Sequence, residues 1–166
     1  MGFVQMLWVT LGRPTMTEIQ EIYFEIFDAG DIVRLEPKRL VREGSEVDYD
    51  NNWIVTTVTV KGGKFSGQFD AEFMTIDFEK FKQELRPLYD NLNGSATFSG
   101  LEGQLELKIV GDGIGHFEVR VVACDHPGYG AQLSFIMGLD QTSIKELVNQ
   151  LDKITKRFPV IGDFKI

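Results

Sequence analysis

A length of 166 residues favours a single domain, because folded domains usually contain about 100–200 residues. Hydrophobic residues make up 43% of the chain and charged residues 25%, a balance that excludes wholesale disorder. The 17 Lys and Arg residues against 25 Asp and Glu residues leave a net charge of −8. This charge argues against nucleic acid or an anionic membrane as a partner and favours a basic one.

The single cysteine, Cys124, excludes an intramolecular disulfide and a cysteine-rich metal site, and it fits a reducing compartment. The opening residues are apolar but lack the positively charged start of a signal peptide, and no apolar run reaches the length of a membrane span. We therefore expect a cytoplasmic protein with an N-terminal extension (1–15) and a single domain (16–166). Met1 and Met16 both fit as the natural start.

Alternation of apolar and polar residues, rich in Val, Ile, Thr and Phe, predicts that most of the chain is β-structure. A polar, acidic loop is expected over 42–52, and Gly62-Gly63 predicts a tight hairpin. The face of the following strand that we expect to be core carries Phe65, Gly67, Phe69, Ala71 and Phe73. The expected strands are 18–27, 32–35, 53–60, 65–73, 96–99, 104–110, 115–123 and 131–138.

Apolar stripes at helical spacing predict two amphipathic helices, at about 77–92 and 141–158. We expect Asp77 to cap the first helix, Pro87 to kink or break it, and Ser143 to cap the second. The sum is an α+β domain with an antiparallel sheet or sandwich of about seven or eight strands. Periodicity does not decide between one curved sheet and two stacked sheets.

The tripeptide Phe-Ser-Gly occurs twice, at 65–67 and at 98–100, each time at the edge of an expected strand. Since each half of the chain also ends in an amphipathic helix, an internal duplication is one interpretation. A match of three residues arises readily by chance, so the sequence favours coincidence.

The residue patterns give no convincing catalytic or metal-binding set. Cys124 and His126 lie two residues apart, but nothing near them in the sequence lowers the pKa of the thiol. His116 and His126 lack the spacing of a zinc motif. The Gly-rich run 111–115 leads into a strand, whereas a phosphate site needs a helix there. We expect no enzyme, no cofactor and no metal, and keep a thiol enzyme built on Cys124 and His126 as an alternative.

An ordered set of short motifs is spread over 37–160. In chain order the motifs are Asn52-Trp53, Gly62–Gly67, the helical stripe Phe78–Leu92, Leu101–Leu107, Gly111–His116, Leu133–Phe135, Leu139–Thr142 and Phe158-Pro159. This ordered set resembles the WapI-like family of bacterial immunity proteins. These are small intracellular antidotes encoded beside large contact-dependent or secreted polymorphic toxins. The resemblance implies stoichiometric, non-enzymatic binding of the C-terminal domain of a cognate toxin, often a nuclease. It assigns no individual site residue.

A surface for such a partner is expected at the acidic loop, where opposite charges would steer a basic protein and aromatic side chains would anchor it. The residues expected to bind the partner are Glu43, Glu46, Asp48, Tyr49, Asp50 and Tyr129. Two other interpretations stay open. One is a ligand-binding β domain with an apolar pocket under the Phe-rich sheet. The other is self-association, including a homodimer in which residues 1–12 form an exchanged arm.

Overall fold

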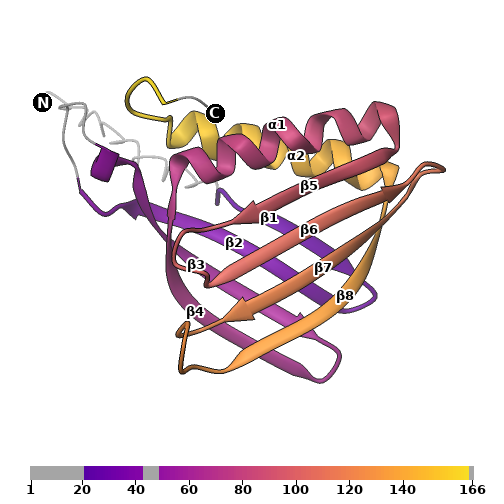
Figure 1. The fold of residues 1–166 in the computed structure, drawn as a ribbon, viewed down its shortest axis with the longest axis horizontal. Helices are drawn as coiled ribbons and strands as arrows, with labels where there is room; N and C mark the ends of the chain where they lie inside the picture. The colour runs from indigo at the N-terminus through magenta and orange to yellow at the C-terminus, as the bar shows by residue number, and fades with distance from the viewer. Residues whose placement is uncertain (1–20, 43–48, 165–166) are drawn as a thin grey trace, which may run out of the picture.

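The computed structural model describes residues 21–42 and 49–164, in which eight strands form two antiparallel four-stranded sheets accompanied by two helices (Figure 1). The sheet orders are β1-β2-β3-β4 and β5-β6-β7-β8. This confirms the expected α+β class and resolves it into two sheets. The elements are β1 (Phe24–Asp28), β2 (Asp31–Leu40), the short 3-10 helix η1 (Tyr49–Asn52), β3 (Trp53–Gly62), β4 (Phe65–Met74), α1 (Thr75–Asn91), β5 (Asn93–Ser99), β6 (Leu105–Asp112), β7 (His116–Cys124), β8 (Gln132–Asp140) and α2 (Gln141–Arg157).

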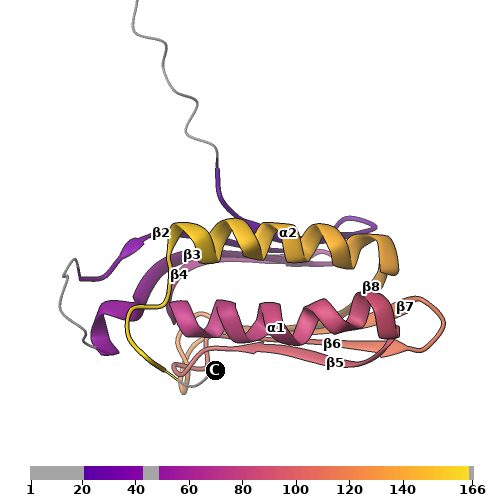
Figure 2. The same ribbon diagram turned by 90° about the horizontal axis from the view of Figure 1, so that it is seen from above.

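The two sheets face each other, and the two helices lie side by side along one edge of the stack (Figures 1 and 2). α2 contacts β1 of the first sheet, and α1 contacts β5 of the second. Inward-facing side chains of both sheets and both helices form one continuous buried core. Within it, the rings of Phe73, Phe78, Phe81 and Phe98 meet edge-on or tilted, with centroids 5.1–6.3 Å apart.

The β3–β4 hairpin shows how the alternating pattern builds the core. Every second residue of β3 from Ile54 to Val60 is buried, and the residues between them face outward. On β4, Ala71 and Phe73 are buried as expected, but Phe65 is 73% exposed. The expectation of a core face along the whole strand is therefore wrong at its start, because β4 begins beyond the end of the core, beside the hairpin turn.

α1 begins two residues earlier than expected, because its N-cap is Met74 rather than Asp77. Asp77 occupies the third helical position, where its carboxylate accepts the backbone N–H of Met74 at 2.9 Å. The predicted break at Pro87 is wrong, since the helix continues to Asn91. Pro87 is exposed and lies near the C-terminal end of the helix. It lacks a backbone N–H and so costs the helix one hydrogen bond, but packing of the buried apolar stripe keeps the helix continuous.

α2 spans Gln141–Arg157, close to the expected range, but Ser143 does not cap it. The N-cap is Asp140, whose backbone is extended and whose side chain makes no capping hydrogen bond. β8 therefore passes into α2 without a loop. The backbone N–H of Gln141 donates to the carbonyl oxygen of Gly115 at 3.0 Å, which satisfies one of the free donors at the helix start.

The two halves of the described chain repeat the same order of elements, four antiparallel strands followed by a helix. The Phe-Ser-Gly tripeptides fall on β4 and β5, which are the fourth strand of one half and the first strand of the other. Their match is therefore coincidental. The two halves nevertheless share one topology. Chance therefore explains the tripeptide match but not the repeated order of elements.

Each edge strand has one backbone N–H that donates to a side chain from a distant part of the chain. The edges β1 and β5 are held in this way by side chains of α2 and α1, and the edges β4 and β8 by side chains from the other half of the described chain. The four pairs, with the donor first, are Glu25 and Gln150, Thr97 and Glu84, Glu72 and Gln104, and Gly138 and Asp28, at 2.8, 2.8, 3.4 and 2.8 Å. Equivalent edges of the two halves thus use equivalent contacts.

Candidate functional site

A cleft of about 420 Å³ opens where edge strand β4 passes the β5–β6 and β7–β8 turns of the other sheet. Figure 1 shows both turns beside β4 at one end of the molecule. Four carboxylates line this acidic cleft, from Asp70, Glu72, Glu102 and Asp125. The other lining residues are Val55, Ala71, Gln104, His126, Pro127 and Tyr129.

Strand β4 supplies two of the carboxylates through its outward face. Asp70 and Glu72 lie two residues apart, so they point to the same side of the sheet, opposite to Ala71 and Phe73 in the core. Thr57 on β3 pairs with Asp70 on β4, and the Thr57 hydroxyl donates to Oδ1 of Asp70 at 2.7 Å. The alternation that buries one face of β4 therefore places two negative charges on the other.

Gln104 connects the cleft to the second sheet. Its side-chain Oε1 accepts the backbone N–H of Glu72 at 3.4 Å, and its own carbonyl oxygen accepts the backbone N–H of Cys124 at 2.9 Å. Glu102 lies two residues earlier, in the exposed β5–β6 turn. The third carboxylate thus comes from a turn that is fixed to both sheets.

Asp125 holds the β7–β8 turn that forms the far wall of the cleft. Its Oδ1 accepts the backbone N–H of Ala131 at 2.8 Å, and the backbone N–H of Gly130 donates to the carbonyl oxygen of His126 at 2.6 Å. Desolvation raises the pKa of the Asp125 carboxyl, but the N–H donors of Ala131 and His126 outweigh it, and the pKa lies below its usual value. Asp125 is therefore ionised at neutral pH.

Tyr129 projects from this turn with 85% of its surface exposed. Its ring stacks on His126, with centroids 5.4 Å apart and an interplanar angle of 30°. The Nδ1 atom of His126 lies 3.5 Å from Oδ1 of Asp125. An exposed tyrosine supported in this way offers a large amphipathic surface, which is typical of an interface anchor.

The acidic cleft suits a positively charged partner group. Neither Lys nor Arg is among the described residues that line it. Carboxylates in such a hollow attract Lys and Arg side chains and offer Arg a bidentate acceptor. Chemically, the arrangement is one for binding a basic surface.

Other chemistry considered from the sequence finds less support. In the Gly-rich 111–115 turn, the carboxylate of Asp112 accepts the backbone N–H groups of Ile114 and His116, as in an ordinary hairpin turn. Cys124 is half-buried at the end of β7, and the ring of His126 packs on Tyr129. Within 21–42 and 49–164, no three His, Cys, Asp or Glu side chains gather as metal ligands would, and neither helix is long and apolar enough to span a membrane.

Residues 24–159 match the model of a protein family described as the immunity protein WapI-like family. The chain belongs to this family. The expectation drawn from the ordered motifs is thereby confirmed, over a range that begins at β1 and ends just after α2.

The comparison with curated proteins gave no match. Among solved structures, MRP1/MRP2 of Trypanosoma brucei is similar with a TM-score of 0.47 and 8% identity, covering 82% of this chain and 85% of that one. The plant transcriptional regulator PBF-2 is similar with a TM-score of 0.48 and 11% identity, covering 83% of this chain and 82% of that one.

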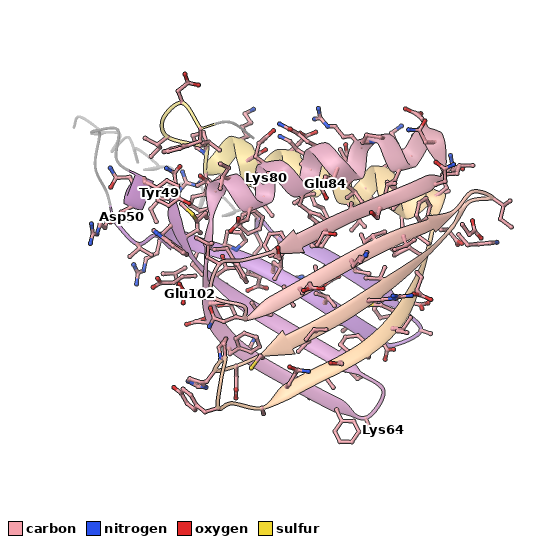
Figure 3. All side chains as sticks on the ribbon, viewed as in Figure 1. Tyr49, Asp50, Lys64, Lys80, Glu84 and Glu102 are labelled. Atoms are coloured by element: carbon pink, nitrogen blue, oxygen red, sulfur yellow. The ribbon has the colours of Figure 1, made fainter. Side chains whose placement is uncertain are left out.

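The structure of this WapI-like chain places the expected partner-binding residues in two groups. Tyr129 lines the acidic cleft, and Tyr49 and Asp50 lie in η1. The remaining three expected residues, Glu43, Glu46 and Asp48, and the expected extension 1–15 lie outside the described residues. Figure 3 shows Tyr49, Asp50 and Glu102 toward the same end of the molecule.

The end of the expected loop 42–52 is a 3-10 helix instead, with Tyr49 and Asp50 exposed on it. The ring of Tyr49 meets Phe164 edge-on, with centroids 5.3 Å apart. The carboxylate of Asp50 lies 3.4 Å from the guanidinium of Arg42. Both side chains are thus accessible, and each already contacts another part of this WapI-like protein.

Buried Asn52 fixes η1 to the rest of the domain. Its Oδ1 accepts the Thr75 hydroxyl at 2.6 Å and the Ile161 backbone N–H at 2.8 Å. Its Nδ2 donates to the carbonyl oxygens of Ile161 at 2.9 Å and Tyr49 at 3.3 Å. The start of α1, the segment after α2 and the Tyr49 turn therefore depend on one side chain.

Sequence reasoning missed the carboxylates of the cleft. The period-two pattern of β4 places Asp70 and Glu72 on its outer face, and this signal was available. Nothing in the sequence indicates that the turns carrying Glu102 and Asp125 pass the outer face of β4, because strand alternation carries no information on how two sheets are stacked.

Proposed function

We propose that this chain neutralises the C-terminal domain of a cognate bacterial toxin by binding it in a one-to-one complex in the cytoplasm, without catalysis. Membership in the WapI-like immunity family, over residues 24–159, carries this proposal. Neutralisation by direct binding needs an accessible surface that recognises the toxin. The acidic cleft and Tyr129 supply the chemistry for one.

The charge of the chain supports a basic toxin, such as a nuclease. Nucleases hold phosphates through Lys and Arg side chains, and these are the groups that a cleft with four carboxylates attracts. The net charge of −8 extends this attraction beyond contact distance and speeds encounter at low salt. We infer that the chain covers the phosphate-binding surface of the toxin and so blocks its substrate.

The acidic loop that includes Tyr49 and Asp50 forms the second part of the proposed surface. Its described residues lie toward the same end of the molecule as Glu102 (Figure 3). A toxin domain that buries about 800 Å² on this chain has room to reach both regions. We expect Tyr129 to contribute most per residue, because aromatic anchors dominate such interfaces.

The experiment is co-expression of the chain with the C-terminal domain of the toxin encoded beside it, with growth and co-purification scored together. We expect the toxin domain alone to arrest growth, the chain to restore it, and the two to elute as a one-to-one complex. Tyr129→Ala should weaken rescue while the chain remains folded, because this side chain is 85% exposed. An active toxin domain that arrests growth despite the chain and forms no complex with it would refute the proposal.

A further inference from the structure

Edge strand β8 has no charged residue from Gln132 to Leu139. The other edge of this sheet, β5, is also uncharged, but α1 packs against it. Exposed sheet edges in soluble proteins normally carry charges or prolines, because their free N–H and C=O groups can pair with another strand. Edge strand β4, the corresponding strand of the first half, carries Asp70 and Glu72. The two equivalent edges therefore differ in the feature that prevents pairing.

Among the described residues, no strand pairs with the outer edge of β8, and its outward-facing backbone groups before Gly138 include those of Ser134 and Ile136. In an antiparallel sheet, N–H and C=O groups of alternate residues point to opposite sides of the strand. The N–H of Gly138 points away from β7, since it donates to the carboxylate of Asp28 at 2.8 Å. Ser134 and Ile136 share this direction, whereas the odd-numbered residues between them face β7.

Apolar side chains flank this edge. Ile136 is 62% exposed on β8, and Phe27, beside Asp28, is also 62% exposed. Phe65 is 73% exposed and pairs across the β3–β4 hairpin with Gly62, over which Phe135 of β8 packs. An exposed edge with apolar neighbours is typical of a surface that is covered in use.

The charges around the edge balance. The β1–β2 hairpin carries Asp28 and Asp31, and the β3–β4 hairpin carries Lys61 and Lys64. Figure 3 shows Lys64 at the tip of its hairpin, on the side of the molecule where β8 runs. These two acidic and two basic residues offset one another, so the two hairpins present no excess of one charge to a second copy.

We propose that two copies of the chain associate through their β8 edges, antiparallel about a twofold axis, so that their β5–β8 sheets join into one continuous sheet. An edge strand is complementary to itself in this orientation, as an isologous contact requires. A basic partner has no charge to bind at β8 and is drawn to the acidic cleft instead. The Asp28–Gly138 hydrogen bond limits the pairing to the part of β8 that precedes Gly138.

The test is the mass of the purified chain in solution, measured by sedimentation or light scattering at about 100 µM, where even micromolar dimers are well populated. Ser134→Lys places a charge at the pairing edge. Gln68→Lys is the matched control, because Gln68 occupies the equivalent place on β4. We expect a dimer for the wild type and for Gln68→Lys. Self-association of Ser134→Lys should be weaker by more than about tenfold, with an unchanged unfolding curve.

A monomeric wild type at that concentration would overturn the proposal. So would a dimer that survives Ser134→Lys, or one that is lost only when residues 1–12 are deleted. A lower unfolding midpoint in Ser134→Lys would call for Ile136→Thr, which keeps a β-branched residue and removes apolar contact; this variant should also weaken the dimer. No toxin is needed for the measurement, so its outcome is independent of the proposed function.

Discussion

The carboxylate of Asp28 accepts the backbone N–H of Gly138 at 2.8 Å, although the two residues lie 110 positions apart. Asp28 ends β1 in the first sheet, and Gly138 lies on the edge strand of the second. The contact therefore ties the two sheets together. It also occupies an edge donor that would otherwise be left to solvent or to another strand.

Replacing Asp28 should destabilise the domain in proportion to the loss of this acceptor. We expect Asp28→Ala to lower the free energy of unfolding by about 1–2 kcal/mol, because the edge N–H loses a charged acceptor. Asp28→Asn keeps an acceptor oxygen and should lose less than half as much. Urea unfolding of both variants checks this, and equal losses in the two would show that the hydrogen bond contributes nothing.

Replacing Asn52 should lower the free energy of unfolding far more than replacing an exposed asparagine. Asn52→Ala removes four hydrogen bonds and leaves buried groups of Thr75 and Ile161 without their partner. We expect a loss of about 2–4 kcal/mol in the free energy of unfolding. Asn149→Ala, on the exposed face of α2, should change it by less than about 0.5 kcal/mol. Similar thermal midpoints for the two variants would contradict this role.

Gly130 is required by the turn that carries Tyr129. A Cβ at this position would lie 2.0 Å from Oδ1 of Asp125 and 2.6 Å from the backbone nitrogen of His126. Gly130→Ala must therefore distort the turn, and we expect toxin affinity to fall at least as much as in Tyr129→Ala. Gly67→Ala is the control, since its Cβ would make only an ordinary 3.9 Å contact. Binding titrations with the three variants measure the difference.

The ion pairs of Glu36 predict part of the acid sensitivity. The hydrogen bond from Lys38 is the largest influence on the pKa of the Glu36 carboxyl and lowers it, whereas burial raises it. With the further hydrogen bond from Arg34, the pKa lies below its usual 4.5. Since the folded pKa is the lower one, this stabilisation is present above pH 4.5 and disappears as the pH falls through the folded value. Glu36→Gln should be less stable by about 1 kcal/mol at pH 7 and should lose less stability on acidification. Parallel curves of stability against pH would contradict this.

Local patterns of the sequence carry much of the fold. The β-branched run of β3, the Gly62-Gly63 hairpin and the stripes of both helices each determine an element with little help from distant residues. The errors occur where tertiary contacts override local preference. Pro87 lies in a continuous helix because packing of the apolar stripe holds it, and Phe65 lies outside the core because β4 extends past it.

The acidic cleft needed information that strand alternation does not contain. Its carboxylates come from β4 and from two turns of the other sheet, so they converge only through the stacking of the sheets. Tyr129 was identified as an anchor from its exposed Gly-rich setting, without any indication of these neighbours. Charge composition predicted a basic partner, but a net charge carries no information on where in the fold the carboxylates gather.

The affinity of the chain for its toxin domain at low salt, measured for two matched double variants, distinguishes binding at the acidic cleft from a general effect of net charge. Glu72→Lys with Glu102→Lys reverses two charges of the acidic cleft, and Asp90→Lys with Glu146→Lys makes the same change in net charge on the exposed faces of α1 and α2. If the cleft binds the toxin, the first pair weakens association by more than about tenfold and the second by less than about threefold. Equal losses would mean that only net charge matters, and an unchanged affinity in the cleft variant would exclude the cleft as the toxin-binding surface.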